Sequence, residues 1–348
     1  MKTLYKKNTL ILVLTALFCL SFTLDASAQQ MTIPGTKAQI SLKIAPAHPK
    51  PFDTVHLIAE SFSTDLNRST INWYVNGKLV KSGVGQKELD TTVGDFGTKQ
   101  DVRMAAKTSL GMLQSTVTLQ PAEVDLFWQA HSFTPPFYKG KAQPTHKSGV
   151  TVVASPHLVT AKGVAIDPHD LIYMWRENGT AKADKSGIGR NSYELREISI
   201  MRGNATVDVS VTAPAGTLEA VGTVVIYPET PKLLLYEHDP LEGIKYNKAL
   251  TETFELVNDE VTVEAMPYFF GTQNKEGSDM IYTWKVNNQT VENNTAAQGS
   301  ITLRQTGESG LASVSLNARH RNNQLESVAT GLSFKFGKNS SSKLFPAK

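Results

Sequence analysis

The chain has 348 residues, with 35 basic and 32 acidic side chains and a formal net charge of +3. A charge this close to balance gives no general electrostatic attraction to nucleic acid or to an anionic membrane, so neither is an expected partner. The single cysteine, Cys19, lies within the first 28 residues, which excludes disulfides and thiolate metal sites from the rest of the chain.

Residues 1–28 have the three parts of a secretory signal in the right order. Lys2 provides positive charge at the start together with Lys6 and Lys7, and residues 9–24 are almost wholly apolar. That run is shorter than the ~20 residues needed to span a bilayer. Ala26-Ser27-Ala28 then supplies small side chains before a cleavage site at Gln29. We predict a signal peptide over 1–28, whose removal leaves 32 basic and 31 acidic residues.

Cys19 raises the alternative of a lipoprotein, in which a lipidated cysteine becomes the new N-terminus. Phe18 stands before it, where a lipoprotein signal needs a small side chain, so we interpret Cys19 as an apolar residue of the signal core. The last segment, 339–348, is polar and basic and is predicted to be a flexible tail. We therefore expect no transmembrane anchor after signal cleavage.

Three tryptophans recur in one local context at nearly equal intervals, which predicts an internal repeat of about 105 residues. A turn pair follows each tryptophan three and four positions later, giving Trp73 with Asn76-Gly77, Trp175 with Asn178-Gly179, and Trp284 with Asn287-Asn288. A two-residue type I′ turn needs positive φ at both positions, which Asn and Gly tolerate. Each tryptophan should therefore lie on a core-facing strand that enters a hairpin.

Alternating apolar runs surround each tryptophan in the same order, as expected for β-strands with one buried face. They are, in chain order, 55–59, 102–104 and 117–121 in the first repeat, 150–154, 207–211 and 224–228 in the second, and 261–265, 314–316 and 332–336 in the third. The pairs Gly83/Gly85 and Gly187/Gly189 follow two of the hairpins and suit turns or bulges. No segment has a convincing helical period, so the fold class is all-β.

A strand, a tryptophan strand and a later paired strand are the order of an immunoglobulin-like domain, with apolar residues in place of the disulfide. On the Trp-x-x-Asn-Gly spacing, the chain resembles the tandem immunoglobulin-like and PKD-like repeats of bacterial surface and secreted proteins. The whole chain also resembles exported proteins of small candidate-phylum bacteria, a resemblance that implies no established function. We predict three tandem immunoglobulin-like β-sandwich domains, over 34–123, 124–231 and 232–338, packed end to end into a rod.

Signals for catalytic or metal chemistry are weak. No pair of histidines has a zinc-binding spacing, and Asp167-Pro-His169-Asp170 suits an ordinary turn. Glu242, Asp259 and Glu260 are candidates for calcium at a domain junction, but a solvated surface is the favoured interpretation. The glycine pairs are not phosphate loops, and no nucleophile-elbow motif is present. We expect no enzyme activity, no cofactor and no metal.

Two aromatic segments are the candidate interaction surface, because large apolar groups in loops often mark recognition sites. Their aromatic residues are Phe133, Phe137, Tyr138, Tyr268, Phe269 and Phe270. The alternative is that both segments lie at domain edges and seal contacts between domains.

The expected function is that of a non-catalytic protein at the cell surface, in the periplasm or outside the cell. It would act as a structural spacer, an adhesin-like protein or an interaction scaffold, with an envelope protein or polysaccharide as partner. A carbohydrate-binding or accessory module is the alternative, and a hydrolase with an undetected site is a third possibility.

Overall fold

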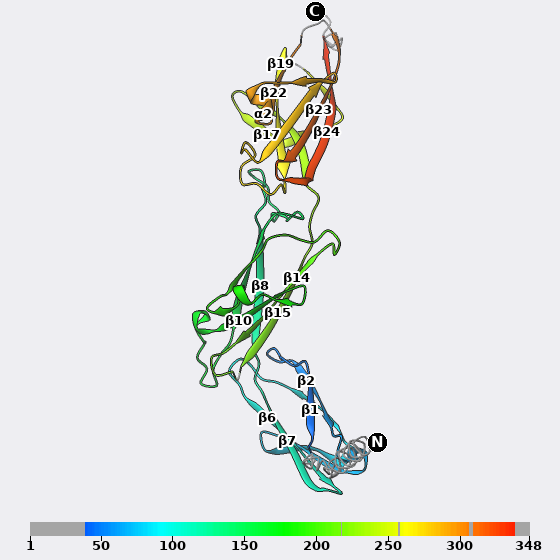
Figure 1. Cartoon of the computed structure of the whole chain (residues 1–348), viewed down its shortest axis with the longest axis vertical. Helices are drawn as coiled ribbons and strands as arrows, with labels where there is room; N and C mark the ends of the chain where they lie inside the picture. Colours follow the sequence, from blue (N-terminus) through cyan, green and yellow to red (C-terminus); the bar gives the residue numbers. More distant parts are fainter. Residues whose placement is uncertain (1–38, 217, 257, 306–308, 338–348) are drawn as a thin grey trace, which may run out of the picture.

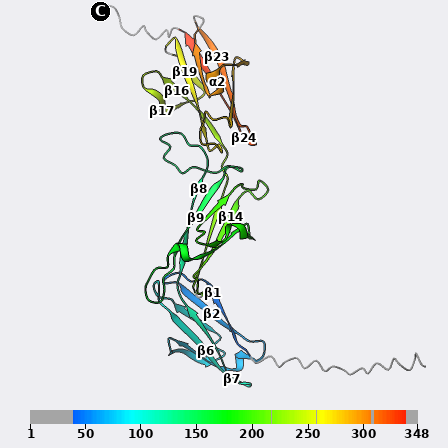
Figure 2. The ribbon, with the colours of Figure 1, turned by 60° about the vertical axis from the view of Figure 1, so that its left-hand side comes forward.

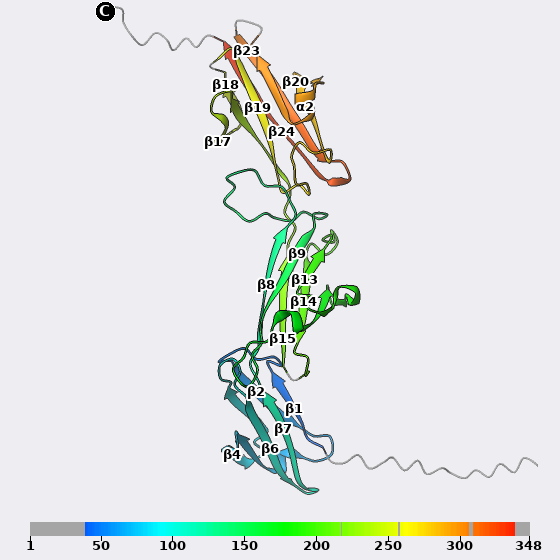
Figure 3. The ribbon, with the colours of Figure 1, turned by 90° about the vertical axis from the view of Figure 1, so that its left-hand side faces the viewer.

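The computed structural model describes residues 39–337, apart from 217, 257 and 306–308. The predicted signal peptide over 1–28 and the predicted tail over 339–348 lie outside these residues. The described strands form three β-sandwiches, each with two sheets, that follow one another end to end along the molecule (Figure 1). The same succession is seen in the turned views of Figures 2 and 3.

The first domain has a three-stranded and a four-stranded antiparallel sheet. In spatial order, the first sheet holds β1 (Ser41–Ala45), β2 (Thr54–Glu60) and β5 (Glu88–Thr92), and the second holds β4 (Lys78–Val84), β3 (Thr70–Val75), β6 (Gln100–Thr108) and β7 (Gly111–Leu119). The short 3-10 helix η1 (Leu66–Arg68) lies in the loop from β2 to β3.

The second domain repeats this arrangement. One sheet holds β13 (Ser192–Leu195), β9 (Val150–His157) and β8 (Glu123–Ala130), and the other holds β11 (Thr180–Ala181), β10 (Ile172–Glu177), β14 (Ala205–Thr212) and β15 (Glu219–Ile226), with β12 (Gly187–Ile188) also on β10. The 3-10 helices η2 (Pro168–Asp170) and η3 (Ala183–Lys185) occupy its loops.

The third domain adds elements that the sequence patterns did not predict. One sheet holds β17 (Gly243–Leu250), β16 (Lys232–Asp239), β19 (Glu260–Tyr268) and β22 (Ser300–Arg304), and the other holds β18 (Thr253–Glu255), β24 (Asn323–Gly337), β23 (Ser309–His320), β20 (Met280–Val286) and β21 (Gln289–Val291). The additions are β17, which extends the first sheet, β18, which pairs in parallel with β24, and the one-turn helix α2 (Asn294–Ala297).

The predicted fold class is confirmed, because each domain is a pair of β-sheets around a buried tryptophan. Trp73, Trp175 and Trp284 are all fully buried. Each belongs to its own apolar cluster, and the three clusters run from Ile40 to Leu119, from Ala122 to Ile226 and from Leu233 to Phe334. The domains are therefore immunoglobulin-like sandwiches held by separate cores.

The asparagine after each tryptophan strand has two structural roles. As predicted, it occupies the left-handed region, with φ of 49° at Asn76, 51° at Asn178 and 48° at Asn287. Its side-chain oxygen also accepts a hydrogen bond from a backbone N–H of the next long strand, at Asp101 in β6, Thr206 in β14 and Ser313 in β23. Asparagine thus forms the turn and ties the hairpin to the neighbouring strand, which explains why it recurs.

The third tryptophan differs from the other two in its polar contact. Trp73 Nε1 donates to the carbonyl of Gln86 and Trp175 Nε1 to that of Arg190, both at 2.8 Å. Gln86 and Arg190 directly follow the glycine pairs noted in the sequence. In the third domain α2 stands at this point of the chain, and Trp284 Nε1 has no hydrogen-bond partner among the described residues.

Candidate functional site at the domain junctions and the free tip

The loop from β8 to β9 carries the first aromatic segment into contact with the third domain. Phe133 N donates to the carbonyl of Phe270, and Phe269 N donates to the carbonyl of Phe133, both at 2.8 Å. The two aromatic segments predicted from the sequence therefore meet, and they do so through backbone bonds of the kind found in antiparallel strands. These two hydrogen bonds hold the second and third domains together, which is the role that the alternative interpretation gave to the aromatic segments.

A buried carboxylate completes this second junction. Glu326, near the start of β24, is only 1% exposed, and Thr145 of the second domain is 2% exposed. Thr145 Oγ1 donates to Glu326 Oε1, and Gly271 N donates to Glu326 Oε2 at 3.0 Å. One acceptor side chain thus satisfies donors from both domains. Because a buried carboxylate is costly unless it is hydrogen-bonded, this contact favours one relative placement of the two domains.

The six predicted surface residues differ in exposure. Phe269 and Phe270 are buried, at 4% and 0%, whereas Phe137 is 84% exposed. Tyr138 packs edge-on against Tyr268 and Phe269, each at 5.8 Å between ring centroids. Phe133 and Tyr268 are partly exposed. Phe269 and Phe270 are therefore taken up by the junction, whereas Phe137 and, at 38% exposure, Tyr138 remain open to solvent.

Neighbouring tyrosines extend this aromatic cluster over the third domain. Phe137 lies 5.9 Å from Tyr246, which lies 5.4 Å from Tyr236. The hydroxyls of Tyr236 and Tyr268 are hydrogen-bonded at 2.9 Å. The pKa of Tyr268 is raised above its ordinary value mainly by burial and secondarily by this hydrogen bond, so its hydroxyl stays protonated.

The first junction uses different contacts. Ala122 N donates to the carbonyl of Pro49 at 3.1 Å, and Gln120 Nε2 donates to the carbonyl of Val159 at 3.1 Å. An exposed ion pair joins Lys50 Nζ to Glu123 at 2.5 Å. Gly97 approaches the second domain so closely that a Cβ there would lie 2.9 Å from the carbonyl oxygen of Thr160.

The polar cluster around Thr151 in the second domain differs in geometry from a catalytic triad. His131 Nε2 lies 2.6 Å from Thr151 Oγ1, which in turn donates to Glu194 at 2.7 Å. The hydroxyl stands between the imidazole and the carboxylate, whereas nucleophilic catalysis needs the imidazole between them. Asp167 caps the η2 turn by accepting from His169 N, as the turn interpretation predicted.

No group of three or more metal-ligating side chains is found among the described residues. Of the three calcium candidates, Glu260 is paired with Arg304, and Glu242 lies 3.9 Å from Lys245. Both carboxylates therefore already have a cation nearby.

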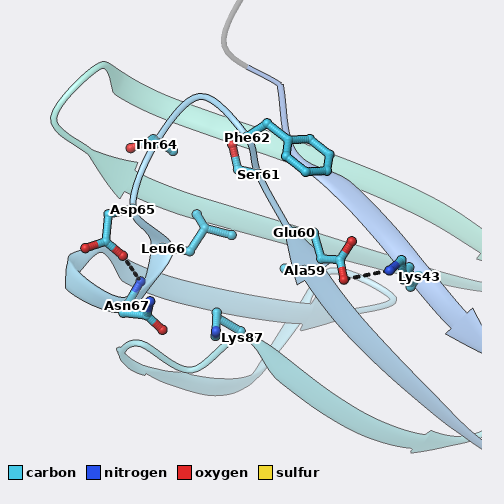
Figure 4. Close-up of a pocket in the computed structure, with 10 residues that line it drawn as sticks. All are labelled: Lys43, Ala59, Glu60, Ser61, Phe62, Thr64, Asp65, Leu66, Asn67 and Lys87. Carbon is cyan, nitrogen blue, oxygen red and sulfur yellow. Dashed lines mark hydrogen bonds and ion pairs between the residues drawn. The ribbon is translucent and has the colours of Figure 1, made fainter.

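The loop from β2 to β3 encloses an open hollow of about 600 Å³ at the end of the first domain away from the second. Figure 4 shows its lining, in which Lys43 pairs with Glu60 and Asp65 accepts from Asn67 N. Phe62 on its rim is fully exposed. No sequence pattern marks this loop, since one phenylalanine in a polar segment has no periodicity or motif.

Within the described residues, no helix has the length and apolar character to cross a membrane. No family model and no curated protein matches the chain.

The solved structures with some likeness to the chain include several multi-domain arrays. The three N-terminal domains of the Highly Immunogenic Outer Capsid protein of bacteriophage RB49 match with 10% identity and a TM-score of 0.25, covering 86% of this chain and 98% of theirs. Fibronectin(III)-like modules of Clostridium thermocellum CbhA match with 14% identity and a TM-score of 0.26, over 54% and 94%. Sidekick-1 immunoglobulin domains 1–4 match with 9% identity and a TM-score of 0.20, over 86% and 74%. Scores this low carry no functional argument.

Proposed function

We propose that this chain is a non-catalytic spacer and interaction scaffold, belonging to an exported protein of a bacterial surface or envelope. The observation that carries the proposal is the second junction. There, paired backbone bonds between Phe133 and Phe269/Phe270 and the shared carboxylate of Glu326 join two domains that each have their own core. Domains joined only by a short linker move freely by default, so a junction of this kind is expected where a fixed separation matters.

Export is part of the same proposal and rests on the signal-like residues 1–28. The resemblance to exported tandem-domain proteins of candidate-phylum bacteria belongs to it as well. An envelope protein or a polysaccharide is the proposed partner, because a spacer must be held at one end and present something at the other.

Small-angle X-ray scattering tests the spacer. The purified chain should have the largest dimension of three domains in a line, and Glu326→Ala should broaden the distance distribution toward shorter values. Glu255→Ala is the matched control, since Glu255 forms only an exposed pair with Lys335 within the third domain. A wild-type distribution as broad as that of the Glu326 variant would contradict the spacer.

Cell fractionation with an antibody to the chain, followed by crosslinking, tests export and partnership. Envelope-bound protein crosslinked to a reproducible partner is the expected result. Protein retained in the cytoplasm with residues 1–28 still attached would sink the export proposal and leave the spacer proposal standing.

A carbohydrate-binding or accessory module is the second candidate, favoured by the fully exposed Phe62 beside the polar hollow and by Phe137. Saccharides stack on aromatic rings and hydrogen-bond to surrounding polar groups. A polysaccharide pull-down should retain the wild-type chain and lose Phe62→Ala, with the exposed Phe127→Ala as control. Failure of the wild-type chain to bind across the panel removes this candidate.

A further inference from the structure

The last strand of the first domain has an open edge. β7 stands at the end of its sheet, paired on one side with β6 over the whole length Gly111–Leu119. No strand pairs with its other side in the part of the chain that the structure describes. An edge of this kind presents unpaired backbone N–H and C=O groups that can template another strand.

The equivalent strands of the other two domains are covered. In the third domain β18 pairs with β24 from Thr253 to Glu255. In the second domain β8 passes directly against β15, so that a Cβ on Gly222 would lie 3.0 Å from Val124 Cγ1. In the first domain β1 approaches β7 less extensively than β8 approaches β15, and among the described residues no strand is hydrogen-bonded to the open side of β7.

The sequence of β7, GMLQSTVTL, also lacks the features that usually protect an edge. It has no charged residue and no proline, whereas the opposite edge strand of the same sheet, β4, carries Lys78 and Lys81. Met112 is 65% exposed and Leu110, in the preceding turn, is 58% exposed. A long, uncharged edge is rare in proteins that stay single, because charges and prolines are the normal means of preventing pairing.

We propose that β7 pairs with β7 of a second copy of this chain, antiparallel and about a twofold axis at Ser115, to form one continuous sheet across two first domains. A second copy is the favoured occupant because the strand is complementary to itself. Full overlap about Ser115 places Gln114 opposite Thr116 and Met112 opposite Thr118, and it opposes no like charges.

The backbone N–H and C=O groups of β7 point alternately toward β6 and toward the open edge, in a way that is consistent with this register. Gly111 faces Thr108 of β6 across a two-residue turn, and Ser115 faces Met104, so these odd-numbered residues direct their backbone groups toward β6. The even-numbered residues from Met112 to Thr118 then present their N–H and C=O groups to the open edge. Ser115 would lie opposite its own copy in a non-hydrogen-bonded pair, with Cα atoms about 4.5 Å apart.

That separation allows a disulfide, and the chain has only one other cysteine to remove. In the chain carrying Cys19→Ser, Ser115→Cys should form a covalent dimer under mild oxidation. Ser82→Cys is the matched control, because Ser82 is an exposed serine on β4 at the opposite edge of the same sheet. Ser115→Cys should crosslink several-fold faster than Ser82→Cys.

Analytical ultracentrifugation of charge variants tests the same register without oxidation. Wild-type chain should show a dimer that grows with concentration. Gln114→Lys with Thr116→Lys places like charges opposite each other and should weaken dimerisation by roughly tenfold, whereas Gln114→Glu with Thr116→Lys places opposite charges together and should preserve it. The proposal is overturned if the wild-type chain stays monomeric and both cysteine variants crosslink equally slowly. It is also overturned if the chain dimerises and the two lysine substitutions leave its dimerisation constant unchanged.

Discussion

The two domain junctions are held by contacts of different strength. At the second junction the acceptor Glu326 is 1% exposed and receives hydrogen bonds from Thr145 and Gly271. At the first, the charged contact between Lys50 and Glu123 is open to solvent, with side chains 57% and 26% exposed. Buried charge-assisted bonds are lost at a high cost, while exposed pairs contribute little, so we expect the second junction to resist bending more than the first.

The largest effect is expected from Glu326→Ala. The substitution leaves the Thr145 hydroxyl and the Gly271 N–H without their acceptor in a buried place, at a cost of about 2–5 kcal/mol. Scanning calorimetry should show that loss, and hydrogen exchange at Gly271 should accelerate. The stability of Glu326→Gln should lie between those of the wild-type chain and Glu326→Ala, because the two donors reach different carboxylate oxygens and an amide keeps an acceptor at only one of these positions. An unchanged exchange rate at Gly271 would mean that Glu326 does not lock the junction.

At the first junction, the tightest contact is made by a glycine, and its effect can be isolated. Gly97→Ala and Gly163→Ala both place a side chain at positive φ, 77° and 79°, with a similar backbone cost of about 1–2 kcal/mol. Only the Gly97 substitution also brings a Cβ within 2.9 Å of the carbonyl oxygen of Thr160, whereas Gly163 has open space. Gly97→Ala should therefore destabilise the chain by about 1–3 kcal/mol more than Gly163→Ala, as measured by chemical denaturation. Equal losses of stability in the two variants would show that the first junction accommodates the added methyl group at no cost.

The backbone contribution to the second junction can be separated from that of the ring. Phe133→Ala and Phe133→Pro both remove the aromatic side chain, but only proline also removes the N–H that donates to the carbonyl of Phe270. The proline variant should be less stable than the alanine variant by about 1 kcal/mol, with additional loss of amide protection at Phe269. If the two variants behave alike, the ring and not the backbone pairing holds this part of the junction.

Whether a feature could be predicted from the sequence depends on how far apart in the chain the residues that determine it lie. The hairpins after Trp73 and Trp175 were predicted because Asn-Gly specifies a turn locally, and the alternating strands because period 2 is visible within a few residues. The order of those strands then made the fold class predictable.

The junction residues carry no such local signal. Thr145 and Glu326 are 181 positions apart, and neither stands in a motif. The aromatic segments were recognised, but the sequence left open whether they bind a ligand or each other, because burial of Phe269 and exposure of Phe137 depend on how the domains meet. The edge status of β7 likewise depends on which strands pair elsewhere in the sheet.

The smallest effect is expected at Lys50, and its pH dependence identifies the interaction. The hydrogen bond to Glu123, with the nearby carboxylates, raises the pKa of Lys50 above its ordinary value of 10.5 despite some burial. A raised pKa in the folded state means that the pair stabilises the chain below pH 10.5 and that this contribution is lost as the pH rises through the folded-state pKa. Lys50→Ala should cost less than about 1 kcal/mol at neutral pH, and less still at high salt. Lys43→Ala is the control, since its pair with Glu60 is somewhat more exposed and lies away from the junction, beside the hollow at the other end of the domain. If only Lys50→Ala alters the scattering curve, even this weak pair helps to orient the first domain. If neither variant does, the first junction keeps its geometry without the pair, through the close approach of Gly97 and the hydrogen bonds that Ala122 and Gln120 donate.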